Sequence, residues 1–478
     1  MRVLFVTYDI YMEPLGILYL SSVLKQAGHE TALAVISEED VLATARSFRP
    51  DVVAYSLHTG VQQYHLAVNN RLKQERAFFA AFGGPHPTFF PEMIEEQGVD
   101  GVCLGEGEAA LLNLVQRLEN GQPLSDLKNW WLRHNGQIQR NPLAPLIADL
   151  DTIPFPDREL MRSKEYLLKY PGQRSIMTAR GCPYRCTYCF NHAYVELYGG
   201  EGRRVRRRSV DNVIEEALQL KLDYGLQFVY FADDTFNLMT EWLAEFADKY
   251  PTKVGIPFLC NIRANVVTEE RMRLIARAGA YSVCMGIETG NERLRNTVLK
   301  RGMTDEQIYR AARIIHDLGL KLYTTNILGN PGSSLEDDWQ TVRLNQAVRP
   351  HATSVTLLQP YPRTEIREYA ASLGLIKGTV EDIPSSYARS TVIKMEPKQR
   401  RQVENLHHLF GLLVQAPWLM PVARFLIWLP LTRLYLLFYM IFNEYLTRSR
   451  IFKPAPSFKF YWRTVKSRLR GRWPFHMG

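Results

Sequence analysis

Three cysteines stand close together in the middle of the chain, as Cys182, Cys186 and Cys189 in the segment 179–191. Their C-x3-C-x2-C spacing places three thiolates on one short loop. Three thiolates can hold three irons of a cubane [4Fe–4S] cluster, whereas an electron-transfer cluster normally takes four. The fourth iron then keeps an open coordination position, at which a substrate can bind. The spacing therefore predicts a metal centre with a vacancy.

A structural zinc site and a disulfide are the alternatives for these cysteines. Zinc sites normally have four closed ligands drawn from two separated pairs. His192 follows closely and could be a fourth ligand, but no second pair exists, and Cys103, Cys260 and Cys284 are scattered singly. Disulfides are rare in reducing compartments. Because the N-terminus shows no secretory signal, we expect a cytoplasmic protein with reduced cysteines.

Apolar runs of strand length alternate with amphipathic stretches of helical spacing after the cysteine loop. The last predicted helix has Thr304 as its N-cap, Gln307 three residues later and Gly319 at its end. Strands that alternate with helices form a parallel sheet. The predicted strands are 175–179, 228–231, 256–260, 281–286, 321–328 and 354–359, and the predicted helices include 213–224, 269–278 and 305–318.

Polar residues and glycines follow four of these strands. In parallel barrels, the chemistry takes place at the C-terminal ends of the strands. Any one of these residues alone is explained as a strand-end cap or turn, but four positions in strand order after the cysteine loop favour a ligand site. They are Asp233 and Asp234 after the second strand, Arg263 after the third, Glu288 after the fourth, and Gly329 and Gly332 after the fifth.

The cysteine loop, including Tyr188 before its third cysteine, resembles the signature loop of the radical S-adenosylmethionine (SAM) superfamily. This resemblance implies a partial (β/α)6 barrel and a [4Fe–4S] cluster whose free iron binds the amino and carboxylate groups of SAM. Reduction of the cluster would cleave SAM to methionine and a 5′-deoxyadenosyl radical, which abstracts hydrogen from an unactivated C–H bond. An electron donor such as flavodoxin or ferredoxin is the implied partner.

The resemblance also implies roles for the residues that follow the strands. Asp233 and Asp234 stand where the family has a Gly-Gly-Glu-like segment that meets the SAM amine. Arg263 suits the methionine carboxylate, because a guanidinium binds a carboxylate bidentately. Glu288 would accept hydrogen bonds from the ribose or the amine. The two glycines after the fifth strand would let the backbone approach the adenine.

The first 135 residues are predicted to form a separate unit. Short apolar runs again alternate with helical segments, which predicts a doubly wound Rossmann-like sheet that binds ligands at the carboxyl ends of its strands. The predicted strands are 2–7, 30–35, 51–56, 78–83 and 101–104, with helices at 15–26 and 108–118.

Three pieces of this first unit resemble the cobalamin (B12)-binding domain that precedes many radical SAM barrels. The pieces are 14–20, 83–88 and 105–108. The resemblance implies that Ser56, Gly83 and Gly84 line the nucleotide tail of cobalamin. The loop 9–16 contains no histidine, so a bound corrinoid would lack the axial ligand that the best-known cobalamin domains supply. A Rossmann-like domain that binds nothing is the alternative.

The end of the chain differs from the rest in composition. An apolar, aromatic stretch over 409–442 precedes a tail, 445–478, that holds nine Arg or Lys residues and no acid after Glu444. The net charge of +9 therefore comes from this end. No uncharged piece of the stretch reaches the roughly 18 residues of a membrane span. An apolar segment with a basic tail suits the surface of an anionic membrane.

A helical cap with a solvated basic tail is one alternative for this end, and nucleic-acid binding is another. No recognised nucleic-acid module accompanies the tail, so we expect no nucleic-acid partner. Pro154 and Pro156 make the linker between the first two domains stiff. The expected domains are 1–135, cobalamin-binding; 136–170, linker; 171–395, radical SAM barrel; and 396–478, a mainly helical apolar and basic extension.

Together these features predict an α/β enzyme that uses cobalamin and SAM. Its expected reaction is methylation of an unactivated carbon of a hydrophobic or membrane-associated small molecule, such as a lipid, isoprenoid or tetrapyrrole, at the inner face of the membrane. One alternative is an oxidative cyclase resembling the anaerobic magnesium-protoporphyrin monomethyl ester cyclase, and another is a non-catalytic corrinoid or redox sensor. A tRNA methylthiotransferase is disfavoured, because the first unit has only Cys103 where those enzymes have three cysteines.

Overall fold

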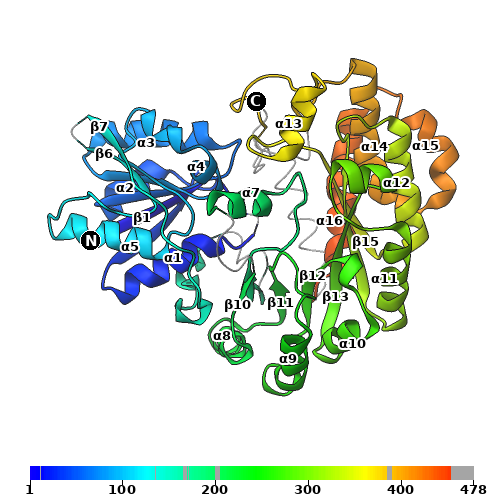
Figure 1. The fold of residues 1–478 in the computed structure, drawn as a ribbon, viewed down its shortest axis with the longest axis horizontal. Helices are drawn as coiled ribbons and strands as arrows, with labels where there is room; N and C mark the ends of the chain where they lie inside the picture. Colours follow the sequence, from blue (N-terminus) through cyan, green and yellow to red (C-terminus); the bar gives the residue numbers. More distant parts are fainter. Residues whose placement is uncertain are drawn as a thin grey trace. The chain divides into compact units, whose positions relative to one another are not determined.

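The computed structural model describes residues 1–10, 12–134, 136–164, 170, 172–199, 205–384 and 390–453 of the 478-residue chain (Figure 1). The chain divides into two compact units. The first, which we call the N-terminal unit, comprises Met1–Pro171, Tyr194–Arg203 and Pro474–Gly478. The second, the barrel unit, comprises Gly172–Ala193 and Arg204–Trp473.

The N-terminal unit is built on a seven-stranded sheet of order β2-β1-β3-β4-β5-β6-β7. Its first five strands pair in parallel, which confirms the predicted doubly wound sheet. The strand order reverses between β1 and β3, the place at which such sheets bind ligands. The parallel strands are β1 (Arg2–Thr7), β2 (Glu30–Val35), β3 (Val52–Ser56), β4 (Phe79–Gly83) and β5 (Gly101–Cys103). The helices are α1 (Leu15–Gln26), α2 (Val41–Phe48), α3 (Gln62–Glu75), α4 (Pro85–Phe89) and α5 (Glu108–Glu119).

An antiparallel hairpin extends this sheet beyond the predicted strands. It consists of β6 (Trp130–His134) and β7 (Gln137–Arg140), and β6 pairs with β5. Trp130 and Leu132 are buried while Trp131 is half-buried, so the hairpin covers the sheet with alternate side chains. The sheet therefore continues past residue 135, where the sequence places the end of the first domain.

The predicted linker is attached to α1 of its own unit. Asp157 donates its backbone N–H to the Leu18 carbonyl at 3.0 Å, and its carboxylate accepts from Ser21 at 2.6 Å and pairs with Lys25 at 2.7 Å. Arg158 approaches Glu13 at 3.6 Å, with both side chains at most 2% exposed. This polar anchoring, together with the two prolines, fixes the course of the linker along the N-terminal unit.

The barrel unit contains six parallel strands in the order β15-β14-β13-β12-β11-β8. This confirms the predicted alternation and the partial (β/α)6 barrel. The strands are β8 (Gln173–Ile176), β11 (Phe228–Phe231), β12 (Phe258–Ile262), β13 (Ala280–Glu288), β14 (Lys321–Leu328) and β15 (Ala352–Leu357). The helices are α8 (Val210–Tyr224), α9 (Thr240–Lys253), α10 (Glu269–Arg277), α11 (Asp305–Asp317), α12 (Leu335–Val348) and α13 (Glu365–Ser372) (Figure 1).

Fully buried aromatic rings hold α9 to the strands β11 and β12. Phe231, Phe236, Phe246, Tyr250 and Phe258 are all 0% exposed, with ring centroids 4.6 to 6.0 Å apart in the contacting pairs. Offset and edge-to-face pairs of this kind add to the stabilisation from burial. The same core contains Cys260, which is 0% exposed.

One predicted local feature is also confirmed. The capping box of α11 is present, since Thr304 accepts from the Gln307 N–H at 3.2 Å and Gln307 accepts from the Thr304 N–H at 3.1 Å. The basic cluster before α8 pairs locally: Arg207 lies 3.6 Å from Asp233, and Arg208 lies 2.5 Å from Glu216.

The C-terminal extension packs on the edge strand of the barrel sheet. It forms α14 (Pro397–Gln415), the single 3-10 turn η6 (Pro417–Leu419), α15 (Met420–Leu426) and α16 (Thr432–Arg450). The His407 ring and the Tyr439 hydroxyl both lie within hydrogen-bonding distance of the Val355 carbonyl of β15, at 3.0 and 3.3 Å. These helices thereby cover a strand edge that would otherwise be open. Among the described residues no helix is long and apolar enough to cross a membrane, and tail residues 454–478 lie outside them.

Candidate active site

The cysteine loop runs from β9 (Ala179–Arg180) to α7 (Phe190–Leu197) and is tied to the barrel through Thr187. The Thr187 N–H donates to the Leu299 carbonyl at 3.2 Å, and its hydroxyl donates to the Val298 carbonyl at 2.7 Å. The Thr187 carbonyl accepts from the Ile366 N–H at 3.1 Å. The segment between Cys186 and Cys189 is therefore held in place from two sides.

The three thiols on this loop are free, with Cys186 buried and Cys182 and Cys189 partly exposed. Burial raises the pKa of Cys189 to about 12, and the negative charge of nearby Asp234 adds to the rise. Burial likewise raises the pKa of Cys182. A bound metal overcomes such a rise, because it deprotonates the thiols that coordinate it.

This donor set fits the predicted cluster. No three His, Cys, Asp or Glu side chains of the described residues surround one common ion position. A [4Fe–4S] cluster does not need such convergence, since each cysteine binds a different iron. Three free thiols on one anchored loop would thus hold three irons and leave the fourth open.

Two buried guanidinium groups face Cys186. Nη1 of Arg263 lies 3.6 Å from the Cys186 Sγ, and Nη1 of Arg301 lies 4.0 Å from it. Arg263 also stacks on the ring of Tyr184, 3.7 Å from its centroid. The prediction placed Arg263 near the methionine carboxylate of SAM, and the structure brings it to the cysteine loop. Arg301 follows no motif in the sequence that marks it as a site residue.

The two neighbouring aspartates have different surroundings. Asp233 is 1% exposed and accepts the backbone N–H groups of Thr178 and Ala179 at 2.6 and 3.1 Å. Its carboxylate is therefore used within the fold, where it joins the ends of β8 and β11. The Asp234 side chain is exposed and is hydrogen-bonded to Asn191. Of the two, Asp234 is the one that is placed to meet a ligand beside the cysteines.

Glu288 ends β13 in a backbone conformation that is unusual for its residue type. Its φ is +68°, and a register shift in the pairing of β13 with β14 begins beside it. The buried carboxylate lies 3.4 Å from Arg301, and Tyr188 hydrogen-bonds to it. Burial raises the pKa of Glu288, and the positive charge of Arg301 opposes that rise. Strained residues of this kind concentrate at functional sites.

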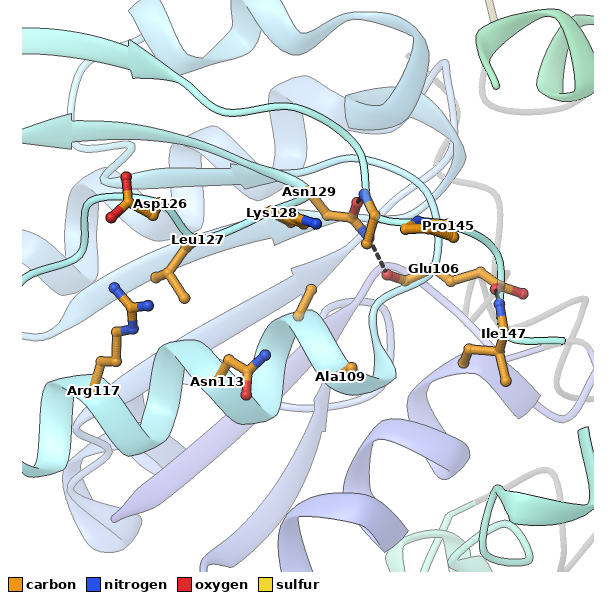
Figure 2. A pocket seen from close by; sticks show the side chains of 12 residues that line it. Glu106, Ala109, Asn113, Arg117, Asp126, Leu127, Lys128, Asn129, Pro145 and Ile147 are labelled. Carbon is orange, nitrogen blue, oxygen red and sulfur yellow. Dashed lines mark hydrogen bonds between the residues drawn. The ribbon is translucent and has the colours of Figure 1, made fainter. Parts of the chain in front are cut away.

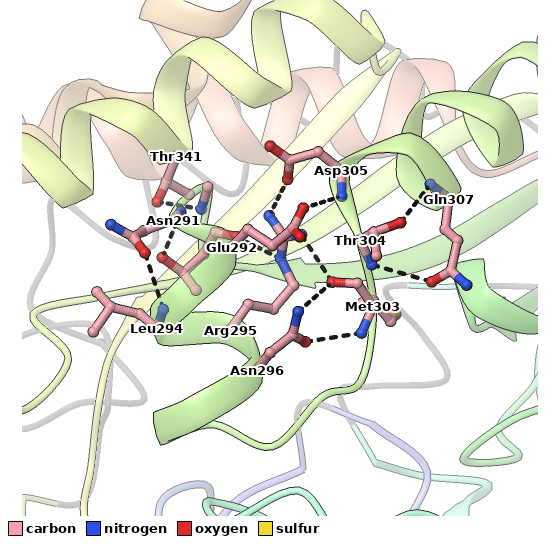
Figure 3. A network of polar contacts seen from close by, with 12 residues as sticks. Asn291, Glu292, Leu294, Arg295, Asn296, Met303, Thr304, Asp305, Gln307 and Thr341 are labelled. Carbon is pink, nitrogen blue, oxygen red and sulfur yellow. Dashed lines mark hydrogen bonds and ion pairs between the residues drawn. The ribbon is translucent and has the colours of Figure 1, made fainter.

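A polar network fixes the loop that follows Glu288, as Figure 3 shows. At its centre is Arg295, whose side chain is 0% exposed. Arg295 donates to the carbonyls of Thr289 and Met303 at 3.0 and 3.1 Å and pairs with Asp305 at 2.6 Å. The network connects this loop to the start of α11 and so supports the strained position of Glu288.

The two predicted glycines lie in the loop between β14 and α12. Gly329 and Gly332 have φ values of +68° and +73°, which favour glycine. The Gly329 N–H donates to Asp338 at 3.1 Å, and burial raises the pKa of this carboxyl to about 7. A Cβ on Gly329 would lie 2.9 Å from Cε of Met395, and contact of this loop with an adenine stays a prediction.

In the N-terminal unit, the predicted cobalamin residues gather at the carboxyl ends of neighbouring strands. Ser56 of β3 is paired with Gly83 of β4. Gly84 has a φ of +98°, and a Cβ there would lie 2.9 Å from the Leu57 carbonyl oxygen. A Cβ on Gly83 would lie 3.7 Å from the Cβ of Cys103, at an ordinary van der Waals distance. His86, in α4, lies within hydrogen-bonding distance of the Thr59 hydroxyl at 3.0 Å.

A pocket of about 250 Å³ lies against α5 in the N-terminal unit (Figure 2). Asn129, with a φ of +70°, forms part of its wall by donating to the Glu106 carbonyl at 2.9 Å and accepting from the Ala144 N–H at 2.5 Å. Arg117 and Lys128 also line it. Ser56, Gly83 and Gly84 are not among its lining residues, but Glu106 of the predicted piece 105–108 is.

Comparison with known proteins gives two family matches. The model of the radical SAM superfamily matches residues 176–344, and the model of the B12 binding domain matches residues 1–115. The radical SAM match contains the cysteine loop and all four of the strand-end positions that follow it. The B12-binding match contains all five parallel strands of the N-terminal unit.

The chain is also similar to individual proteins. An uncharacterised methyltransferase of Pyrococcus horikoshii is 29% identical over 76% of this chain and 79% of its own length. An anaerobic magnesium-protoporphyrin IX monomethyl ester cyclase of Rubrivivax gelatinosus is 24% identical over 74% of this chain and 65% of its own. A solved cobalamin-dependent SAM radical enzyme shares the fold, with a TM-score of 0.68, 16% identity, and coverage of 98% of this chain and 74% of that one.

Proposed function

Since the chain belongs to the radical SAM superfamily and carries an N-terminal B12-binding domain, we propose that it methylates an unactivated carbon of a hydrophobic small molecule. The observation that supports this most directly is the combination of three free cysteines on one anchored loop with a cobalamin domain in the same chain. Methyltransferases among its relatives point to the same reaction.

The bound groups would supply a radical from SAM and a methyl group from cobalamin. The chain's own residues would position them. Cys182, Cys186 and Cys189 would hold the cluster, while Arg263 and Arg301 place positive charge beside Cys186. Asp234, exposed next to the cysteines, and Glu288, held by its φ of +68°, would accept hydrogen bonds from SAM.

The test uses the anaerobically reconstituted enzyme with SAM that carries a deuterated methyl group. A solvent extract of apolar cell metabolites serves as the substrate mixture. We expect 5′-deoxyadenosine, S-adenosylhomocysteine and deuterium in an apolar product, each measured by mass spectrometry. Retention of corrinoid absorbance through purification tests the cobalamin site separately. Absence of S-adenosylhomocysteine would contradict methyl transfer.

An oxidative cyclisation is the second candidate, because relatives include the anaerobic magnesium-protoporphyrin cyclases. In the same experiment it would give 5′-deoxyadenosine without transferred deuterium. A corrinoid or redox sensor would give neither product. The proposal includes a lipid, isoprenoid or tetrapyrrole as the substrate and contact with the inner face of the cytoplasmic membrane, and the apolar C-terminal helices support both. It also includes reduction of the cluster by flavodoxin or ferredoxin.

We expect Arg301 to make the cluster easier to reduce. Its guanidinium stabilises added negative charge near Cys186, and hydrogen bonds and charges near cluster sulfurs set reduction potentials. Replacement by methionine should lower the potential by on the order of 100 mV, the effect of one charge at an effective dielectric of about 20. Redox titration followed by electron paramagnetic resonance measures this. Arg301→Lys is the control that keeps the charge, and an unchanged potential in Arg301→Met would contradict the role.

A further inference from the structure

The largest group of exposed apolar side chains lies on the C-terminal helices. Of the 17 large hydrophobic side chains that are exposed among the described residues, ten fall between residues 418 and 445. Trp418 is 76% exposed, Phe425 66% and Leu434 58%. Single exposed apolar residues are ordinary, but a concentration of this kind marks an interaction surface.

These side chains follow the periodicity of the helices that carry them. On α16, the exposed residues Leu434, Phe438, Ile441 and Tyr445 recur at spacings of three and four and so share one face. Val422 and Phe425 repeat the pattern on α15. We call this set the apolar face; it comprises Trp418, Val422, Phe425, Trp428, Leu431, Leu434, Leu437, Phe438, Ile441 and Tyr445.

A different face of α16 already packs against the barrel unit. Tyr435 and Leu446 are 8% and 3% exposed and belong to buried clusters with β15 residues. The part of the apolar face on α16 therefore stays exposed although the helix packs against the barrel unit through other residues. Trp418, Phe425 and Leu434 are the most exposed side chains of the apolar face and so bury the smallest fraction of their area within the chain.

The charges that the helices of the apolar face carry are almost all positive, although Arg424 of α15 pairs with Glu336 of α12 at 3.1 Å. From residue 405 to the end of the chain, Glu444 is the only acidic residue, and it pairs with Arg448 at 3.3 Å. Arg433 is exposed at the beginning of α16. Six further Lys or Arg residues lie between 454 and 478 in the sequence. Two tryptophans and a tyrosine are in the face itself, and such rings favour the boundary between water and lipid.

We propose that the apolar face binds the surface of an anionic lipid bilayer, with α15 and α16 lying on it. The apolar side chains enter the boundary between headgroups and acyl chains, and the adjacent cations attract the anionic headgroups. No described helix is long and apolar enough to cross a membrane, which is compatible with binding at the surface. The proposal extends the proposed function by specifying the surface through which an enzyme acting on apolar substrates would reach them.

The test is co-sedimentation of the full-length protein with vesicles of phosphatidylcholine alone or of phosphatidylcholine mixed with phosphatidylglycerol. The test variant combines Trp418→Ser, Phe425→Ser and Leu434→Ser. The matched control combines Leu222→Ser, Tyr309→Ser and Leu373→Ser, which removes exposed apolar side chains elsewhere in the barrel unit. Circular dichroism and melting temperature establish that both variants fold. Removal of residues 454–478 gives a third protein.

We expect the wild type and the control to bind the anionic vesicles, the test variant to bind at least tenfold more weakly, and salt to weaken binding. Equal binding by the test variant and the wild type would overturn the proposal. So would binding that depends on residues 454–478 alone, or a dimer that the test variant dissociates in light scattering, since a second copy would then cover the face. Vesicle binding needs neither SAM nor cobalamin, so its failure is distinguishable from failure of the proposed methyl transfer.

Discussion

Replacement of Cys186 by serine is expected to abolish reductive cleavage of SAM. Cys186 is the buried member of the three cysteines, and two guanidinium groups lie within 4.0 Å of its sulfur. Loss of a residue that only supports a metal ligand typically costs 10–100-fold. Loss of the ligand itself should therefore reduce formation of 5′-deoxyadenosine by more than about 100-fold.

This loss of activity should result from loss of the iron–sulfur cluster, which is measured as the iron and sulfide content after reconstitution. We expect Cys186→Ser to retain a smaller amount of both than the wild type. The control is Cys103→Ala, which changes a buried cysteine of the N-terminal unit and should leave cluster content and SAM cleavage unchanged. Full iron content with full SAM cleavage in Cys186→Ser would contradict the assignment of the loop.

The sequence predicts the bounds of four strands correctly, including β14, whose run Lys-Leu-Tyr-Thr-Thr-Asn-Ile-Leu contains polar residues. β1, β2, β11 and β14 begin and end at the predicted residues. β12 begins two residues later than predicted, directly after Pro257, because proline cannot donate to the ladder and tends to precede a strand. The β6–β7 hairpin is missed since its second strand, Gln-Ile-Gln-Arg, has one apolar residue and depends on pairing with its neighbour.

The order of the strands predicts where the candidate site residues lie in the fold. It does not predict which side chains these residues contact. The sequence does not distinguish Asp233 from its neighbour Asp234. Only the fold shows that the Asp233 carboxylate accepts hydrogen bonds from Thr178 and Ala179 and pairs with Arg207. Arg301 reaches Cys186 across 115 positions of the chain, and no local pattern marks it. A cationic residue in a buried segment becomes informative only when its partners are known.

The second large expected effect is destabilisation of the barrel unit by acid through His408. Burial lowers the pKa of His408 to about 3, and the neighbouring His407 adds to this shift. The folded state binds fewer protons at this site than the unfolded state, in which a histidine has a pKa near 6.5. The contribution of neutral His408 to the free energy of unfolding is therefore fully present above about pH 6.5. It is then lost as the pH falls toward the folded pKa.

His408→Leu should therefore be more stable than the wild type in acid. With one pKa unit corresponding to about 1.4 kcal/mol, the difference in unfolding free energy should grow from near zero at pH 7.5 to about 3 kcal/mol at pH 4.5. His408 is 3% exposed and its Nδ1 has no hydrogen-bond partner, so leucine removes the titration without leaving a partner unpaired. Urea unfolding at a series of pH values measures the difference.

His408→Gln separates titration from apolar packing. Glutamine does not titrate, so the unfolding free energy of His408→Gln should increase relative to that of the wild type as the pH falls from 7.5 to 4.5. A buried amide lowers the stability of this variant by the same amount at every pH. Measuring differences between variants cancels the opposing contribution of Asp338, whose burial raises its carboxyl pKa to about 7. If the unfolding free energies of the wild type, His408→Leu and His408→Gln changed in parallel between pH 7.5 and 4.5, His408 would be protonated in the folded state. The helices α14 and α16 would then admit water around it.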